Sequence, residues 1–335
     1  MDVRLTPPTA GQSVAALIEP RGNVVLERWI GAQRDWLREQ LLEHGALLFR
    51  GFGVADPERF AAFLDRAGLP RMDYPRGTSP RTEVGRQIYT STETRPDVEI
   101  PMHTEMSYTS YYPEAVAFCC VTPARVGGAT PLADMRRVRD RLDPGLLEGF
   151  EQRGLQYVQI VPLEPTASLE RSWPAMFGTA DRAEVEHAAA AQGIECSWLD
   201  DGALRITGIC PALRPHPASG ELVWFNQAHV FHLRLFEYLQ EEGVGDAREQ
   251  ARSFRAGRST ADLEPYQCRY GDGGEIPDVA MKQVRAALDA ETTRFDWQRG
   301  DLLLLDNFRA GHARDTFEGE RRVLAALISN AWEKH

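Results

Sequence analysis

The chain has 335 residues, of which 43% are hydrophobic and 26% charged, as is typical of a globular protein that buries a sizeable core. Its 49 acidic residues outnumber 38 Lys and Arg, so the formal net charge is −11, which argues against a nucleic-acid or membrane-surface partner. The N-terminus has no cationic start followed by an apolar stretch, and no apolar run is long enough to span a bilayer. Five cysteines without a C-x-x-C pair favour neither a disulfide framework nor a cysteine zinc site. We expect a cytoplasmic protein.

The first predicted elements are helices and a short strand. Apolar residues at helical spacing predict a helix over 26–44, and a buried strand follows at 46–50. Asp56 and Pro57 predict the start of another helix, with Asp56 as its cap. Residues 69–87, rich in Pro, Gly, Arg and Thr, predict a long ordered loop near a site.

The rest of the chain adds many short strands. These are predicted over residues 100–108, 115–122, 155–161, 204–209, 302–305 and 321–328. Further helices are predicted from 135, over 182–192, after 222–227, with Leu233, Phe236 and Leu239 along one side, and over 277–288. We expect one domain over 1–335, in which residues 1–24 wrap the surface and residues 164–195 form an insertion. The pattern predicts a mixed α/β fold with a β-sandwich or barrel core and flanking helices.

A histidine and a carboxylate lie two positions apart in the apolar segment 100–108. If this segment is a strand, His103 and Glu105 point to the same face. His312 lies in a second segment of similar character near the C-terminus. Two imidazoles and one carboxylate are the ligands that hold non-haem Fe(II) and leave positions open for a 2-oxo acid and dioxygen.

Such a site also needs an anchor for the far carboxylate of the 2-oxo acid. Arg322 is our candidate, because its planar fork binds a carboxylate with two hydrogen bonds and stays charged. On a strand it shares a face with Leu324 and Ala326, and Arg321 points the opposite way, to solvent. Thr130 follows a Gly-Gly pair that permits close backbone approach, and its hydroxyl is a second candidate donor.

Four motifs occur in order: His103-Thr104-Glu105, Gly127-Gly128-Ala129-Thr130, Asp306 to His312, and Glu318 to Val323. Together they resemble the Fe(II)- and 2-oxoglutarate-dependent oxygenases of the taurine dioxygenase group. The branch with clavaminate synthase and the syringomycin-type amino-acid hydroxylases is the most similar. The resemblance covers roughly residues 45–330.

The resemblance implies a double-stranded β-helix, or jelly-roll, core. It makes His103, Glu105 and His312 the iron ligands, and Thr130 and Arg322 the residues that bind 2-oxoglutarate. It implies an enzyme that uses dioxygen, releases succinate and carbon dioxide, and hydroxylates an unactivated C–H bond. The expected substrate is a small molecule of secondary metabolism, an amino acid or a derivative, either free or tethered to a carrier protein.

Two positions narrow the chemistry by resemblance. Taurine dioxygenase holds its substrate sulfonate with an arginine four residues beyond its anchor, and this chain has Ala326 there. Related halogenases replace the metal carboxylate by a small residue, whereas Glu105 is retained here. A sulfonate substrate and halogenation are therefore disfavoured.

Several alternatives stay open at this stage. A desaturase or cyclase of the same family would use the same site, a zinc hydrolase would also use two His and one Glu, and a non-catalytic jelly-roll binding module is a third possibility. Tyr108, Asn226 and Gln227 are candidate substrate-pocket residues, with aromatic packing for Tyr108 and backbone capping for Asn226 as equal alternatives. His229 and His232, three positions apart, have spacing for a metal pair, but packing is the expected role.

Overall fold

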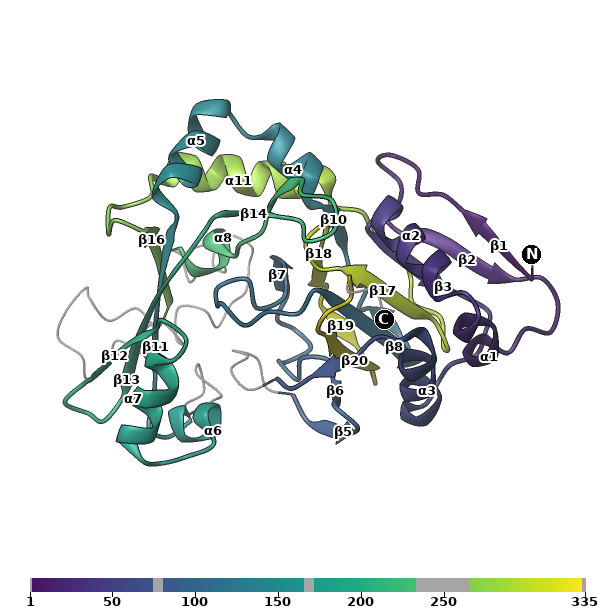
Figure 1. Ribbon diagram of the computed structural model, residues 1–335, viewed down its shortest axis with the longest axis horizontal. Coiled ribbons are helices and arrows are strands. Elements are labelled where there is room, and N and C mark those ends of the chain that lie inside the picture. Colours follow the sequence, from purple (N-terminus) through teal and green to yellow (C-terminus); the bar gives the residue numbers. More distant parts are fainter. Residues whose placement is uncertain (1, 75–80, 166–171, 233–265, 333–335) are drawn as a thin grey trace.

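The largest unit of the fold is a nine-stranded sheet. The computed structural model describes residues 2–74, 81–165, 172–232 and 266–332 of the chain (Figure 1). In this sheet the strand order is β1-β2-β3-β17-β8-β20-β6-β5, and β4 also pairs with β20. Its strands are β1 (Val3–Thr6), β2 (Ala16–Pro20), β3 (Ala46–Phe49), β4 (Arg71–Met72), β5 (Glu83–Gly85), β6 (Ile88–Thr90), β8 (Ala115–Thr122), β17 (Leu302–Asp306) and β20 (Arg322–Ile328).

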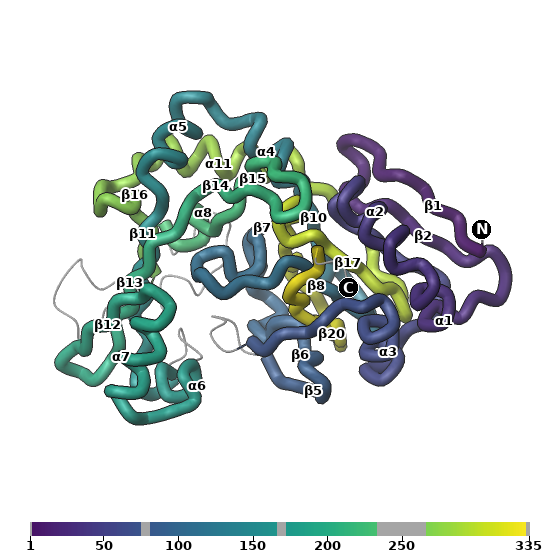
Figure 2. Tube along the Cα trace, in the orientation of Figure 1, coloured from purple at the N-terminus to yellow at the C-terminus, as the bar shows by residue number. Residues whose placement is uncertain are grey.

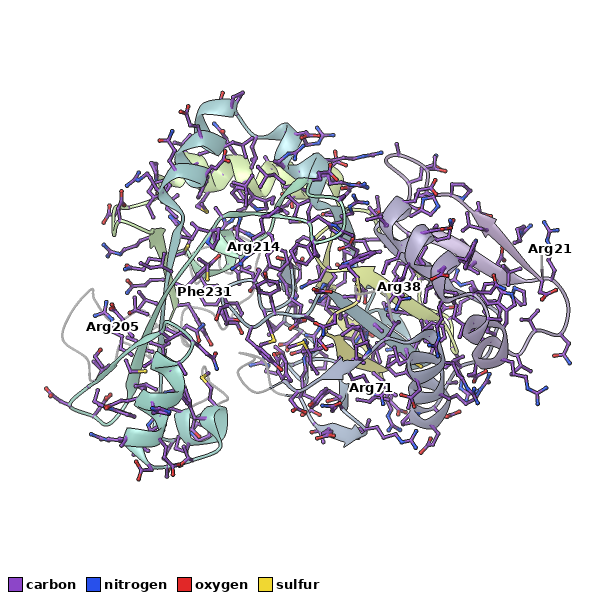
Figure 3. All side chains as sticks on the ribbon, in the orientation of Figure 1. Arg21, Arg38, Arg71, Arg205, Arg214 and Phe231 are labelled. Carbon is purple, nitrogen blue, oxygen red and sulfur yellow. The ribbon has the colours of Figure 1, made fainter. Side chains whose placement is uncertain are left out.

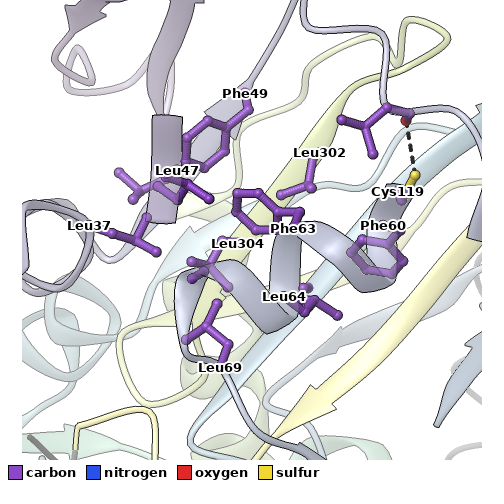
Figure 4. Packing of buried hydrophobic residues seen from close by; sticks show 14 of the residues in the cluster. Leu37, Leu47, Phe49, Phe60, Phe63, Leu64, Leu69, Cys119, Leu302 and Leu304 are labelled. Atoms are coloured by element: carbon purple, nitrogen blue, oxygen red, sulfur yellow. Dashed lines mark hydrogen bonds between the residues drawn. The ribbon is translucent and has the colours of Figure 1, made fainter. Parts of the chain in front are cut away.

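Three helices near the N-terminus cover one face of this sheet: α1 (Leu26–Gly31), α2 (Arg34–His44) and α3 (Pro57–Ala67). The predicted helix over 26–44 is thus two helices, because Gln33 leaves helical geometry with φ −125°. Asp56 caps α3 as expected, and its Oδ1 accepts from Arg59 N at 2.8 Å. Phe60 and Phe63 of α3 are fully buried in a cluster with leucines of β17 (Figure 4). Burial of each such side chain contributes about 1.5–3 kcal/mol.

A three-stranded sheet faces the other side of the nine-stranded sheet. Its order is β10-β18-β7, with β7 at Ile100–His103, β10 at Leu132–Asp134 and β18 at Ala310–Arg314. A second buried cluster joins the two sheets, since it combines Leu132 and Ala310 with Phe118, Leu303 and Val323. Two facing sheets with outer helices agree with the expected sandwich. The complete strand winding of a jelly roll stays a prediction.

The remaining elements form a second region. A four-stranded sheet has the order β12-β13-β11-β16 and lies at the opposite end of the molecule from β1 and β2 (Figure 2). Its strands are β11 (Leu155–Val161), β12 (Glu195–Trp198), β13 (Leu204–Cys210) and β16 (Tyr266–Tyr270). One short strand pair, β14 (Leu213–Pro215) with β15 (Leu222–Trp224), belongs to this region. Another, β9 (Val126–Gly127) with β19 (Phe317–Glu318), lies beside β20 of the large sheet (Figure 1). The helices here are α4 (Met135–Arg141), α5 (Pro144–Arg153), α6 (Trp173–Phe177), α7 (Arg182–Ala190), α8 (Ala228–Phe231) and α11 (Asp278–Glu291).

Most of the predicted elements are confirmed, with differences at the N-terminus and in the middle of the chain. Residues 1–24, expected to wrap the surface, contribute β1 and β2 to the edge of the large sheet. In the expected insertion, α6 and α7 pack against β12 and β13. The helix predicted after 222–227 begins as α8, while Leu233, Phe236 and Leu239 lie outside the described residues. In the described part of the chain, no helix has both the length and the apolar character needed to cross a membrane.

Candidate metal centre

The two sheets bring three separated side chains together. His103 ends β7 and His312 lies in β18, where the two are register partners with ring centroids 4.3 Å apart. Glu105 Oε2 lies 3.9 Å from His103 Nε2 and 3.4 Å from His312 Nε2. One ligand atom from each residue falls within a 4.8 Å group. The three predicted metal ligands therefore form one cluster.

Glu105 reaches this cluster from a turn rather than from a strand. We expected an extended segment through residue 108, but β7 ends at His103 and a turn begins at Glu105. Met106 has the left-handed φ of 54° that this bend requires. Asn307, at the end of β17, fixes the turn: its Oδ1 accepts from Glu105 N at 2.7 Å and its Nδ2 donates to Glu105 O at 3.0 Å. His103 and Glu105 thus face the same space because the Asn307 side chain holds the Glu105 backbone in the turn.

The electrostatics leave the cluster ready to bind a cation. Burial, together with the nearby His312, lowers the pKa of His103 to about 3, so the ring is neutral at pH 7. Its Nδ1 contacts Pro101 O at 2.8 Å, which places the donor proton there and turns Nε2 toward Glu105. Burial alone raises the pKa of Glu105, but Arg81 and the two histidines outweigh it and hold the pKa well below its usual range. Two imidazoles and one carboxylate are the donor set of a non-haem Fe(II) site, so the residues fit that metal.

A pocket of about 430 Å³, partly open to solvent, adjoins the two histidines. Arg321 lies in it, with Nε donating to Gly128 O at 2.9 Å, Nη1 to Ser91 Oγ at 3.3 Å and Nη2 to Thr130 Oγ1 at 3.4 Å. None of these partners is a carboxylate, and no ion pair of Arg321 occurs among the described residues. The pocket is lined by Arg81, Ser91, Thr92, Ile100, His103, Phe118, Thr130, His312, Ala313, Arg314 and Arg321.

The Arg321 guanidinium keeps its charge although it is largely removed from water. Burial, followed by repulsion from Arg314, lowers the pKa of Arg321 to about 10, still well above neutral pH. A desolvated cation without an acidic partner is costly. An anionic ligand in the pocket would remove that cost, and a carboxylate matches the guanidinium fork.

The direction predicted for Arg322 is wrong. Arg322 is exposed, whereas Arg321 lines the pocket. The alternation along β20 is as expected, but its phase is reversed: Val323, Ala325 and Leu327 face the three-stranded sheet, and Leu324, Ala326 and Ile328 face the helices. Arg321 is in phase with the first set, so it points to the metal side. The pairing with β8 also shifts by one residue between Arg322 and Val323.

Thr130 lies where the Gly-Gly pair was expected to permit close approach. A Cβ on Gly128 would meet Arg321 Cδ at 3.0 Å and Ala124 Cβ at 2.9 Å. Gly127 and Gly128 both have left-handed φ, 68° and 71°. The pair therefore lets the backbone lie against the arginine stem, and Thr130, only 4% exposed, follows it into the pocket.

The candidate substrate-pocket residues divide into two kinds. Tyr108 lines a second pocket of about 410 Å³ with Tyr157 and Met176. Its ring packs against that of Phe231, labelled in Figure 3, with the two ring centroids 5.1 Å apart. Asn226 is fully buried and bonds to the backbone at Ala212 O and Ala228 N, the capping alternative.

Gln227 and the histidine pair are also bound to backbone groups. Gln227 Nε2 donates to Thr104 O at 2.7 Å, so it supports the turn that carries Glu105. His229 Nε2 contacts Met102 O at 2.6 Å, and His232 Nε2 contacts Ile276 O at 3.2 Å. These contacts agree with the expected packing role of the two histidines.

Sequence reasoning missed four residues of the site. Arg81 forms an ion pair with Glu105, and Asn307 forms hydrogen bonds with the Glu105 backbone. Trp297 Nε1 donates to Thr130 Oγ1 at 3.0 Å. Arg314 donates to backbone carbonyls in residues 92–98. Arg81 does fall in the segment 69–87 that was predicted to be a loop near a site, although β4 and β5 also lie in this segment. Asn307 and Arg314 flank His312 in the motif region, where proximity was the available signal.

Residues 4–327 match the family described as "Taurine catabolism dioxygenase TauD, TfdA family". The chain belongs to this family. It is a 2-oxoglutarate-dependent non-haem iron dioxygenase, as the resemblance implied. This dioxygenase is 34% identical over 290 residues to the dapdiamide synthesis protein DdaC of Enterobacter agglomerans, covering 87% of this chain and 84% of that protein. It is 30% identical over 329 residues to a clavaminate synthase-like protein of Arabidopsis thaliana, covering 96% and 92%.

Solved structures share the fold of this dioxygenase at low identity. PvcB, described as an Fe, alpha-ketoglutarate-dependent oxygenase from an isonitrile synthetic pathway, matches with a TM-score of 0.56 and 16% identity over 98% of this chain and 92% of its own. A putative taurine dioxygenase from Burkholderia xenovorans matches with a TM-score of 0.55 and 16% identity over 98% and 93%. Both likenesses support the fold.

Proposed function

We propose that this dioxygenase hydroxylates an unactivated C–H bond of an amino acid or an amino-acid-derived intermediate of secondary metabolism. In this reaction 2-oxoglutarate, dioxygen and the substrate become succinate, carbon dioxide and an alcohol. The observation that carries the proposal is a pocket lined by His103 and His312, two of the three cluster residues, and by Arg321, which has no acidic partner among the described residues.

His103, Glu105 and His312 are the proposed iron ligands. The bound iron would supply the activation of dioxygen, and the protein supplies its position. The contact of His103 Nδ1 with Pro101 O orients one ligand, and Asn307 orients the carboxylate. Supports of this kind typically change metal affinity or activity about 10- to 100-fold.

Arg321 replaces Arg322 as the proposed anchor for the distal carboxylate of 2-oxoglutarate. Its guanidinium would donate to that carboxylate, and Thr130 would donate its hydroxyl proton. Thr130 Oγ1 already accepts from Trp297 Nε1 and lies 3.4 Å from Arg321 Nη2, so its own proton remains available. Charged contacts of this kind contribute about 1.5–3 kcal/mol.

The amino-acid-like substrate rests on relatives and on one position. DdaC is named for dapdiamide synthesis, and the Arabidopsis relative is named clavaminate synthase-like. The residue four beyond Arg321 is Ala325, so moving the anchor by one residue still puts an alanine where taurine dioxygenase has its sulfonate-binding arginine. Tyr108 is retained as a candidate wall of the substrate site because it lines the second pocket.

Desaturation or cyclisation would use the same residues and would differ in the product. A zinc hydrolase would need no anion site at Arg321, and a non-catalytic module would release no succinate. Succinate formation with Fe(II) and 2-oxoglutarate separates the dioxygenases from the other two classes. Hydrolytic activity with Zn(II) identifies a hydrolase, and analysis of the oxidised product distinguishes hydroxylation from desaturation or cyclisation.

The first test is an anaerobic titration of the protein with Fe(II) and 2-oxoglutarate, followed by an aerobic screen of free and carrier-bound amino acids for stimulated succinate formation. His103→Ala and Glu105→Ala should lose the absorption of the iron chelate. His229→Gln is a matched control, because His229 is a buried histidine bonded to a β7 carbonyl but outside the metal cluster. Unchanged iron binding in both alanine variants would refute the ligand assignment.

A further inference from the structure

A second arginine lies at the metal end of the pocket. The Arg81 side chain is 6% exposed, and its Nη2 lies 2.9 Å from Glu105 Oε2. The Tyr74 ring lies against it, with the guanidinium carbon 4.4 Å from the ring centroid. These contacts place Arg81 beside the metal ligands, on the pocket wall that it shares with His103 and His312.

Arg81 is only partly satisfied in this position. Its Nε and Nη1 are buried and have no hydrogen-bond partner among the residues that the structure describes. Buried guanidinium nitrogens without partners cost free energy, because they have lost their hydrogen bonds to water. Within the described residues, Glu105 is the one hydrogen-bond acceptor of a guanidinium that carries five N–H donors.

The other arginines of the pocket have different hydrogen-bond partners. Arg314 donates to the carbonyls of Thr94, Arg95 and Val98 at 2.6–2.8 Å, so it holds the chain around these residues. Arg321 lies with Thr130, where the distal carboxylate of 2-oxoglutarate is proposed to bind. Arg81 is thus a separate cation at the metal end of the pocket.

We propose that Arg81 binds a carboxylate that lies beside the metal centre. Planar donors on a buried cation match a carboxylate better than a neutral amide or a thioester. This inference rests on the proposed function for the identity of the pocket. It extends that function by assigning a second anion site at the opposite end from Arg321.

Two molecules of the reaction could bring this carboxylate: the substrate, or the metal-proximal end of 2-oxoglutarate. If the substrate brings it, the substrate keeps a free carboxylate, which rules out an amino acid joined to a carrier through its only carboxyl group. If 2-oxoglutarate brings it, Arg81 sets the orientation of the co-substrate. The chemistry recognised by Arg81 is the same in both cases.

The test follows the Arg81 Nε–H signal by NMR in protein labelled with ¹⁵N-arginine and loaded with Zn(II), which needs no turnover. Loss of a signal in Arg81→Lys assigns it. N-oxalylglycine, a mimic of 2-oxoglutarate, is added first, then acetate, with acetamide as the neutral counterpart. Arg294 is the internal reference, since its Nε already donates to Asp315 Oδ2 at 2.9 Å outside this pocket.

A shift with N-oxalylglycine, and at least a tenfold weaker affinity for it in Arg81→Lys, assigns the carboxylate to the co-substrate. A shift with acetate but not acetamide, on protein already saturated with N-oxalylglycine, assigns it to the substrate. Arg294→Lys should change neither affinity. An Arg81 signal that stays in place with both anions overturns the proposal.

Thermal unfolding of Arg81→Lys and Arg81→Met shows whether a variant that does not bind the anion is still folded. If Arg81→Met does not fold, the titration of the wild-type protein still decides whether Arg81 binds a carboxylate. Failure of the proposed function has a different signature: the wild-type protein would form no chelate with Fe(II) and 2-oxoglutarate. The acetate response of Arg81 is measured independently of that result.

Discussion

The Asn307 side chain forms hydrogen bonds with both backbone polar groups of Glu105. Its Oδ1 accepts from Glu105 N at 2.7 Å and its Nδ2 donates to Glu105 O at 3.0 Å. The same Nδ2 also donates to Pro113 O at 2.8 Å. A carboxylate on a turn would otherwise be poorly positioned, because turns lack the ladder of hydrogen bonds that fixes a strand. The direction of Glu105 therefore depends on the residue that directly follows β17 of the nine-stranded sheet.

Asn307→Ala should weaken metal binding, because the turn that carries Glu105 loses its two hydrogen bonds to the Asn307 side chain. We expect a loss of about 10- to 100-fold in affinity, the usual effect of removing a residue that supports a ligand. Titration with Fe(II) or Mn(II) measures it. Asn226→Ala is the control: Asn226 is also fully buried and bonds to two backbone groups, but away from Glu105. Equal metal affinity in Asn307→Ala and the wild type would show that these hydrogen bonds are dispensable.

Arg321→Ala should raise the half-saturating concentration of 2-oxoglutarate by about ten- to more than a hundredfold, the equivalent of about 1.5–3 kcal/mol. Arg322→Ala removes the same charge from the adjacent exposed position and should change that concentration less than threefold. Initial rates of succinate formation at varied 2-oxoglutarate give both values. The reverse order of effects would restore Arg322 as the anchor.

Trp297→Phe should raise the half-saturating 2-oxoglutarate concentration by about two- to twelvefold, because one neutral hydrogen bond, of about 0.5–1.5 kcal/mol, no longer orients the Thr130 hydroxyl. Trp173→Phe is the matched control. Trp173 is buried and donates Nε1 to Gly202 O at 3.1 Å, but it lies in α6 outside the pocket. The two variants should lose similar stability, and only Trp297→Phe should affect 2-oxoglutarate. If both variants shift it equally, the effect is a general one of packing.

The buried His229 should make the folded protein less stable at acidic pH. Burial lowers the pKa of His229 from 6.5 to about 4, so between these values the unfolded chain binds a proton that the folded protein does not. Stability is therefore lost as pH falls below about 6.5, by about 2 kcal/mol between pH 7 and pH 5 for this group. Urea unfolding of the metal-free protein at both pH values should show a smaller loss in His229→Gln than in the wild type. His187→Gln, at an exposed position of α7, should behave as the wild type.

The strands could be predicted because their signals are local, and the residues of the proposed metal cluster could be predicted because each lies in a short motif. The apolar run 115–122 coincides with β8, and the Asp56-Pro57 signal coincides with the start of α3. The spacing of His103 and Glu105 correctly indicated a common space, although the segment turns after His103. Either an extended or a bent chain can satisfy an i, i+2 pair, and only Asn307, distant in sequence, decides between them.

The error at Arg322 has a specific physical cause. Alternation along β20 was predictable, but both faces of this strand are apolar and buried, so the sequence does not indicate which face meets the metal side. The phase depends on the helices that cover the other face. Arg81 was missed for a related reason: its contact with Glu105 joins two loops, and no periodic pattern reports such a contact.

The register partnership of His103 and His312 has a consequence for how the protein acquires its metal. Because β7 and β18 pair at these two positions, backbone pairing of the strands holds the two imidazoles side by side across the long chain segment between them. The entropic cost of closing that loop is therefore shared with the sheet and does not fall on the metal ion alone. Loading should accordingly behave as simple capture by a finished protein, with kinetics set by ion entry and not by chain rearrangement.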